Sequence, residues 1–238
     1  MKDQPEQTQS TSKSEITGEK VEKLAPSQIL QLISAVSSSP DLDGALRNLV
    51  DSLAMLYSDH QVSIFTPGKG NVYTFFFSGG KKFINLENQI IKPGEGILGS
   101  ALKNLKAILI EDYGTIKEFL PIQAGITSEL VVPIMFQSRL IALLDILSEK
   151  LHSFTTNDQT TLEALAASLS GILFTLQRSQ YLKEKADREE RINMIITQLS
   201  KINTVEESIK TAARGIAKMP EISQAAIYIN PIQTPDSK

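Results

Sequence analysis

Two neighbouring β-strands are predicted by the stretch SELVVPIMFQSRLIALLDILS, residues 128–148. Residues 129–136 and 140–147 are almost entirely apolar, and each run has the length of a core strand. Between them, Gln137, Ser138 and Arg139 form a short polar break of the kind found in tight turns. The stretch therefore predicts two consecutive strands joined by a tight turn.

The segments before this stretch predict the fold class. Residues 62–66 have the two-residue period of a strand, a turn follows at 67–71, and residues 72–77 form the return strand. Further strands are expected at 83–92 and 107–110, and helices at 26–36, 42–56 and 97–105. Strands and helices do not alternate regularly, so we expect an α+β fold with a mainly antiparallel central sheet flanked by helices.

The last third of the chain is expected to be helical. Capping residues at 155–158 open a helix, and Leu162, Leu165, Leu169, Ile172 and Leu176 then recur at spacings of three and four. Nine of the fourteen residues 178–191 are charged, and neither Pro nor Gly interrupts them. This pattern predicts a long C-terminal connector helix with coiled-coil-like spacing and a solvated middle.

An internal repeat is predicted from a gap-free shift of 163 positions. The shift places Ile29 and Val36 on Ile192 and Leu199, and it also aligns the next helix, the break between the helices and the start of the first strand. The expected organisation is a disordered tail at 1–24, a domain at 25–177, a helical connector at 178–202 and the truncated start of a second unit at 203–238.

Composition excludes several classes of function. The chain has 238 residues, 24 of them basic and 27 acidic, so it carries no excess positive charge for nucleic acid or for an anionic membrane. No run approaches the roughly 18 apolar residues that span a bilayer. Cysteine is absent, which excludes disulfides, thiol catalysis and cysteine-bound zinc. The two histidines, His60 and His152, are expected in exposed loops, so no metal and no cofactor is predicted. We expect a cytoplasmic binding or interaction protein.

Four motifs in order resemble the GAF domain, a small-ligand sensor module of signalling proteins. They are GEGILGSA at 94–101, AILIED at 107–112, SELVVPI at 128–134, and LIALLDILS at 140–148 with Phe154 and Asp158 beyond it. Ala142 stands where the family usually has glycine. The resemblance covers roughly residues 26–177 and implies a GAF- or PAS-like fold, with the start of a second copy after the connector.

The resemblance also narrows the expected function. The methionine sulfoxide-reducing branch of the family uses cysteines, and the phytochrome branch normally attaches its bilin through a thiol, so both are expected to be excluded. The cyclic-nucleotide branch has a glutamate after the aspartate of its motif. Here Gln159 follows Asp158, so a cyclic-nucleotide ligand is not expected. We therefore predict a non-catalytic regulatory module that binds an unidentified small molecule or transmits a signal through a dimeric connector. The alternative is a ligand-free dimerisation module. An enzyme is not expected.

The expected ligand pocket lies between the sheet and the irregular segment 94–127, because long irregular segments usually serve a function. The Asp145 and Glu129 carboxylates have two interpretations. They bind a polar ligand, or they have no ligand role and either alternate outward or form a hydrogen bond to a neighbouring turn. The candidate lining residues are Phe75, Phe77, Ile97, Tyr113, Phe119, Leu130, Val132 and Asp145.

A homodimer is expected through the helices, because the apolar stripe of the last helix is wider than one sheet should need. The candidate interface residues are Ile29, Ile33, Leu162, Leu165, Leu169, Ile172 and Leu176.

Overall fold

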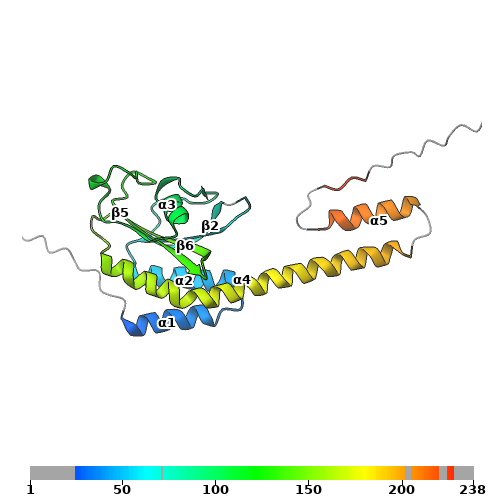
Figure 1. Cartoon of the computed structure of the whole chain (residues 1–238), viewed down its shortest axis with the longest axis horizontal. Helices are drawn as coiled ribbons and strands as arrows, with labels where there is room; N and C mark the ends of the chain where they lie inside the picture. Colours follow the sequence, from blue (N-terminus) through cyan, green and yellow to red (C-terminus); the bar gives the residue numbers. More distant parts are fainter. Residues whose placement is uncertain (1–24, 71, 202–204, 220–223, 228–238) are drawn as a thin grey trace, which may run out of the picture. The chain divides into compact units, whose positions relative to one another are not determined.

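The computed structural model describes residues 25–70, 72–201, 205–219 and 224–227. The expected N-terminal tail, residues 1–24, lies outside the described residues. The chain divides into two compact units, residues 1–177 and 178–238, and the helix α4 (Thr156–Leu199) belongs to both. Figure 1 shows these elements along the chain.

The first unit is built on a six-stranded sheet. Its strands are β1 (Gln61–Pro67), β2 (Tyr73–Gly80), β3 (Ile90–Ile91), β4 (Ile108–Ile110), β5 (Ser128–Phe136) and β6 (Arg139–Ser148). The spatial order is β3-β2-β1-β6-β5-β4, and all neighbouring strands are antiparallel. The expected α+β class and the antiparallel sheet are therefore confirmed, and the opening stretch forms the hairpin β5–β6.

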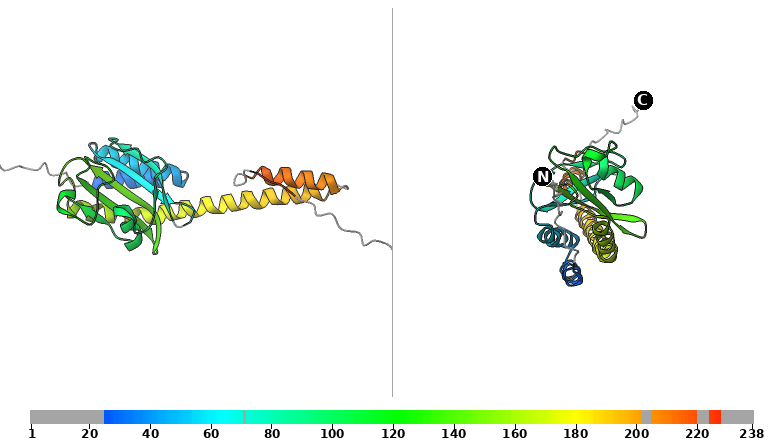
Figure 2. Two further views of the ribbon diagram at one scale, coloured as in Figure 1. Left: turned by 90° about the horizontal axis from the view of Figure 1, so that it is seen from above. Right: turned by 90° about the vertical axis from the view of Figure 1, so that its left-hand side faces the viewer.

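Helices cover the two faces of this sheet unequally. On one face lie α1 (Pro26–Ser37), α2 (Leu42–Leu56) and the first part of α4, while α3 (Gly96–Asn104) and the irregular segments lie on the other (Figures 1 and 2). A short 3₁₀ helix, Tyr113–Thr115, follows β4. The side chain of Asp41 accepts a hydrogen bond from the backbone of Gly44 and so begins α2.

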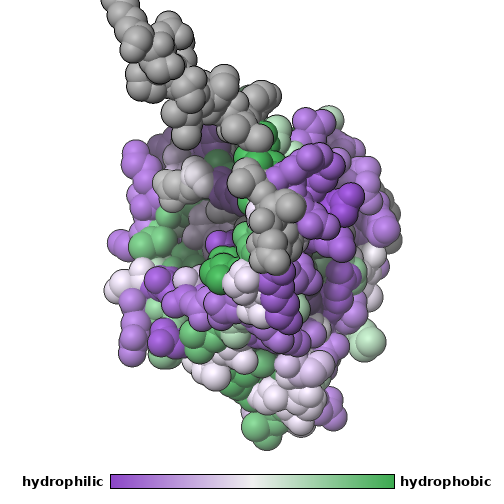
Figure 3. Space-filling view, turned by 90° about the vertical axis from the view of Figure 1, so that its right-hand side faces the viewer, coloured by the Kyte–Doolittle hydropathy of each residue, from purple (hydrophilic) through white to green (hydrophobic). Residues whose placement is uncertain are grey.

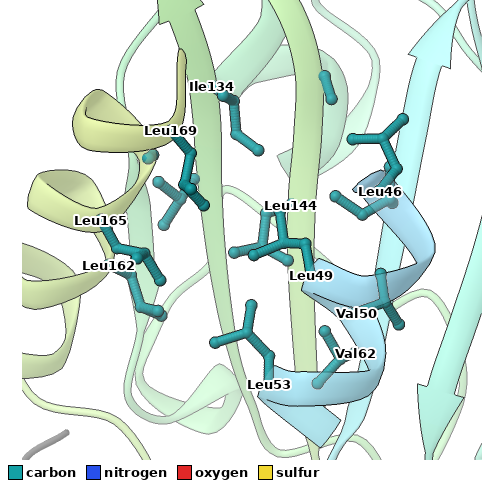
Figure 4. Close-up of a cluster of buried hydrophobic side chains, with 14 of the residues drawn as sticks. Leu46, Leu49, Val50, Leu53, Val62, Ile134, Leu144, Leu162, Leu165 and Leu169 are labelled. Carbon is teal, nitrogen blue, oxygen red and sulfur yellow. The ribbon is translucent and has the colours of Figure 1, made fainter. Parts of the chain in front are cut away.

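The larger core fills the space between the sheet and α2 and α4. Leucines from both helices point at the sheet, because residues three and four apart share one face of a helix (Figure 4). Each fully buried leucine stabilises the fold by about 1.5–3 kcal/mol. The labelled residues are Leu46, Leu49, Val50, Leu53, Leu162, Leu165 and Leu169 from the helices, and Val62, Ile134 and Leu144 from the strands.

A β-bulge changes the alternation of the three consecutive phenylalanines in β2. From the two-residue strand period, Phe75 and Phe77 were predicted on one face. The register shifts between them, so that Ile64 pairs with Phe77 and Phe65 with Phe75. Phe76 and Phe77 therefore both pack on the helix side, whereas Phe75 packs on the other side. The Arg47 guanidinium lies 5.2 Å and 4.5 Å from the centres of the Phe76 and Phe77 rings.

The third expected strand, 83–92, is reduced to Ile90–Ile91. The buried side chain of Gln61 takes the place of a partner strand: its Oε1 accepts hydrogen bonds from the backbone of Phe83 and Ile84, and its Nε2 donates to the carbonyl of Ile84. These bonds satisfy backbone groups that a strand ladder would otherwise pair.

His60 is also placed differently from the expectation. It is buried among Tyr57 and Phe154 rather than exposed in a loop, and neither ring nitrogen has a hydrogen-bond partner. His152 is exposed as expected.

The second unit contains the later part of α4 and the helix α5 (Val205–Ala217). The described residues 224–227 belong to no strand, and Tyr228, the end of the strand expected there, lies outside the described residues.

Figure 3 shows a mainly hydrophilic surface with small, separate hydrophobic patches. Within the described part of the chain, every helix is too short or too polar to cross a lipid bilayer.

Candidate functional site

Three polar side chains meet on the sheet face opposite α2. They are Tyr113 from the 3₁₀ helix, Glu129 from β5 and Asp145 from β6. The side chain of Asp112 accepts a hydrogen bond from Gly114, and the Tyr113 N–H donates to the carbonyl of Thr127, which together hold the 3₁₀ turn over the sheet. The Tyr113 hydroxyl then donates to Glu129 Oε2 at 2.5 Å.

Burial controls protonation in this cluster. Glu129 and Asp145 are each 1% exposed. Burial raises the pKa of Glu129 to about 7, and hydrogen bonds from Tyr113 and Asp145 oppose this rise. The pKa of Asp145 is raised well above its usual range, first by burial and then by Glu129, to which it donates a hydrogen bond. Both shifts have the same direction, so burial favours a proton retained by the carboxyl pair at higher pH than for an exposed carboxyl group.

Unpaired polar atoms surround the carboxyl pair. Asp145 Oδ1, Ser63 Oγ and Thr127 Oγ1 are buried without a hydrogen-bond partner. Ser63 lies directly opposite Asp145 in the β1–β6 register. Each buried unpaired polar group costs about 1–3 kcal/mol. Polar groups of a bound small molecule would satisfy these atoms.

A cavity of about 490 Å³ opens at the edge of the same unit, between β2 and the segment 82–87. Phe75, Phe77, Phe83 and Leu86 line it, together with polar groups such as Asn85. The side chain of Gln123, from the irregular segment after the 3₁₀ helix, donates a hydrogen bond to the carbonyl of Phe83. This volume is within the range of small-molecule sites.

The structure brings most of the predicted pocket residues to one face. The core on the sheet face opposite α2 includes Phe75, Ile97, Tyr113 and Phe119. Asp145 lies within the polar cluster on the same face. The outward position that the sequence allowed for Asp145 and Glu129 is wrong, because both are buried. The hydrogen bond to a neighbouring turn, the other possibility, is found for Glu129, which accepts from Tyr113 of the 3₁₀ turn.

Three predicted pocket residues are not part of the cluster. Leu130 and Val132 alternate with Glu129 along β5 and face α2 and α4. Phe77 packs against the same core through the bulge, although it also lines the 490 Å³ cavity. Ser63 and Thr127 were missed. The signal for Ser63 was a polar residue among the apolar residues of a strand.

The predicted dimer interface also needs correction. Leu162, Leu165 and Leu169 are buried in the core of their own chain, so they are not available to a second one. Ile29, Ile33, Ile172 and Leu176 are only half-buried. Among the described residues, no group of three or more histidine, aspartate or glutamate side chains is arranged to hold a metal ion.

Comparison with known proteins identifies enzymes among the relatives. The chain is 29% identical over 96 residues to the free methionine-R-sulfoxide reductase of Escherichia coli (strain K12). This match covers 40% of the chain and 58% of the enzyme, so the chain spans little more than half the length of that relative.

Solved structures share the fold. The free methionine-R-sulfoxide reductase of Neisseria meningitidis, solved with its substrate, has a TM-score of 0.57 and 22% identity over 63% of this chain and 89% of its own. The GAF domain of an Acinetobacter phosphoenolpyruvate-protein phosphotransferase has a TM-score of 0.56 and 19% identity over 65% and 96%.

The similarity to the reductases contradicts two predictions. We expected a non-catalytic regulatory module and no enzyme, and we excluded the sulfoxide-reducing branch because cysteine is absent; the curated relative is nevertheless a member of that branch. Absence of a thiol excludes one chemical group, but it leaves binding and proton transfer by other side chains open.

A family model described as a GAF domain matches residues 39–173, more than half of the chain. The match accounts for one copy, and the start of a second copy at 203–238 is not supported. Since the matched segment contains all six strands together with α2, α3 and the first part of α4, this chain belongs to the GAF domain family.

Proposed function

We propose that the first unit binds a free sulfoxide-bearing amino acid at the Tyr113–Glu129–Asp145 cluster and donates a proton to its sulfoxide oxygen. The observation that carries this proposal is the buried carboxyl pair, whose pKa values are raised, beside the unpaired Asp145 Oδ1. The named substrate class comes from the E. coli relative, the free methionine-R-sulfoxide reductase.

The chemistry of a sulfoxide suits such a site. Its oxygen carries partial negative charge and becomes a leaving group only after protonation. The proton held between Asp145 and Glu129 would move from that hydrogen bond to the sulfoxide oxygen, which leaves the pair with one proton fewer, and the raised pKa values of the pair suit such a donor. The Ser63 hydroxyl, opposite Asp145, is placed to bond the same ligand. General acid catalysis of this kind contributes roughly 10²–10⁴-fold to a rate.

The electrons come from outside these 238 residues, because they include no cysteine. In the proposed reaction, two thiol groups of another molecule are oxidised to one disulfide, the sulfoxide sulfur gains two electrons, and the oxygen leaves as water with two protons. The chain supplies the first proton and orients the sulfoxide, and an external thiol attacks the sulfur.

Tyr113, Glu129 and Asp145 are all buried, and Ile116, Phe119 and Ile126 of the segment 116–126 pack in the same core as Tyr113. We propose that this segment moves aside to admit the ligand. Two large apolar residues of this segment, Leu120 and Ile122, are exposed. The Gln123–Phe83 hydrogen bond joins this segment to the rim of the 490 Å³ cavity.

Calorimetry and a reduction assay test the proposal together. Free methionine-R-sulfoxide, its S epimer and methionine are titrated into the chain, and reduction is followed by amino-acid analysis with dithiothreitol as the external thiol. We expect the R epimer to bind and to be reduced faster than by dithiothreitol alone. Asp145→Asn should abolish the added rate, and Glu118→Gln, which removes an exposed carboxylate of the covering segment, should not.

The outcomes separate binding from catalysis. Failure of all three ligands to bind contradicts the proposal as a whole. Binding with no rate above that of dithiothreitol contradicts proton donation.

A further inference from the structure

A groove in the second unit lies between α5 and the later part of α4, which run side by side (Figures 1 and 2). It encloses about 470 Å³. Its lining residues are Arg191, Met194, Ile195 and Gln198 from α4, and Thr211, Arg214, Gly215 and Lys218 from the end of α5 and just beyond it.

Gly215 permits the two helices to approach. A methyl group at this position would lie only 2.7 Å from Cγ1 of Ile195. Glycine within a helix costs about 1 kcal/mol relative to alanine, so its presence here is explained by the close contact. Because the helices are consecutive and antiparallel, the contact also sets their register, which places Arg191 and Lys218 toward one end of the groove and Gln198 and Thr211 toward the other.

Positive charge in this groove is not neutralised. Two cations of the unit outside the groove have carboxylate partners: Lys210 Nζ lies 2.6 Å from Glu206, and Lys185 Nζ lies 3.9 Å from Glu189. Arg191, Arg214 and Lys218 form no ion pair with any carboxylate of the described residues, and the groove lining includes no acidic residue.

The positions of two of these cations add to this imbalance. Arg214 lies in the last turn of α5 and Lys218 just beyond its end, and both line the groove, so their like charges repel one another there. A bound anion would remove that repulsion. Between the charged and the polar ends, Met194 and Ile195 offer an apolar floor.

We propose that this groove binds a small organic anion, a carboxylate or a phosphate ester with a short apolar body. The anionic group lies between Arg191, Arg214 and Lys218, because guanidinium groups bind both carboxylate and phosphate through paired hydrogen bonds. The apolar body lies over Met194 and Ile195. Gln198 and Thr211 supply hydrogen bonds at the far end, and the volume is that of a small-molecule site.

Binding of simple probes to the full chain tests this site. Phenyl phosphate and benzoate are titrated separately, with inorganic phosphate and benzyl alcohol as probes that lack the apolar or the anionic part. Amide chemical shifts locate the binding, with Thr211 and Gly215 as reporters. We expect at least one of the two aryl anions to bind with a dissociation constant of about 1 mM or lower and to shift both reporters. Comparison of the two dissociation constants shows whether the groove prefers a phosphate ester, as in phenyl phosphate, or a carboxylate, as in benzoate.

Two variants provide the decisive comparison. Arg191→Gln with Arg214→Gln should weaken binding of the aryl anion at least tenfold, and Lys185→Gln, which removes a paired cation outside the groove, should change it less than twofold. Circular dichroism checks that both variants keep their helices. The proposal is overturned if neither aryl anion binds, if the two variants bind equally well, or if inorganic phosphate or benzyl alcohol binds as tightly as the aryl anions.

Discussion

Replacing Glu129 with glutamine should stabilise the fold at alkaline pH, although it alters the candidate site. The side chain is 1% exposed, and its pKa is raised to about 7 from an ordinary value of 4.5. Because the folded-state pKa is the higher one, the benefit of protonation is fully present below about pH 4.5 and is lost as the pH rises through about 7. Above that pH the fold keeps a buried charge.

The size of the effect follows from the two pKa values. At about 1.4 kcal/mol for each pH unit between 4.5 and 7, ionisation of Glu129 lowers the free energy of unfolding by roughly 3 kcal/mol. Glutamine is neutral at every pH and still offers a side-chain oxygen to the Tyr113 hydroxyl. The variant should therefore exceed the wild type by up to about 3 kcal/mol at pH 8, and the difference should disappear near pH 4.5.

Urea unfolding followed by circular dichroism at pH 4.5, 6, 7 and 8 measures this difference. Glu118→Gln serves as the control, because it makes the same chemical change at an exposed position. A Glu129→Gln advantage that is the same at pH 4.5 and pH 8 would refute the argument, since it would mean that Glu129 does not ionise in this range. A variant less stable at pH 8 would refute it as well.

Three further outcomes are expected. Burial lowers the pKa of His60 below 6.5, so the fold should lose stability as the pH falls below that value. His60→Leu should reduce this loss, measured as the change in urea midpoint between pH 7 and pH 5.5. The same dependence on pH in the variant and the wild type would contradict this. Gly99→Ala places a methyl group 2.2 Å from a backbone carbonyl oxygen and should lower the free energy of unfolding by about 1–3 kcal/mol. Gly171→Ala meets only an ordinary contact at 3.6 Å and should be neutral or stabilising. Equal free energies of unfolding for the two variants would count against the packing argument. We propose that the half-buried residues Ile33 and Leu176 belong to a dimer interface, so replacing both with glutamate should convert a dimer to a monomer in sedimentation equilibrium; a wild-type monomer at tens of micromolar rejects the dimer.

The local patterns predicted the elements well where one face of each element is buried. The stripes of α2 and α4 and the runs of β5 and β6 were identified because apolar residues at helical or strand spacing have to face a core. The GEGILG segment was identified for a similar local reason, since Gly94 and Gly96 have positive φ and Gly99 lies against a carbonyl oxygen. These features depend on neighbours in sequence.

The candidate site was predicted only in part, because its members come from three distant segments. Tyr113 and Asp145 were named from the irregular segment and from a carboxylate within an apolar strand. Leu130 and Val132 were placed on the wrong face because the direction of each strand's alternation depends on which neighbour covers it.

The sequence by itself determined the fold class, the family resemblance, the long helix and the absence of a thiol. Only the tertiary structure decided that the pKa values of Glu129 and Asp145 are raised. Their raised pKa values require burial and mutual proximity, and these arise when β5 and β6 pair and the 3₁₀ turn covers them. Periodicity reports which side chains leave water, whereas the protonation of a carboxyl group depends on the charges and dipoles that folding brings around it.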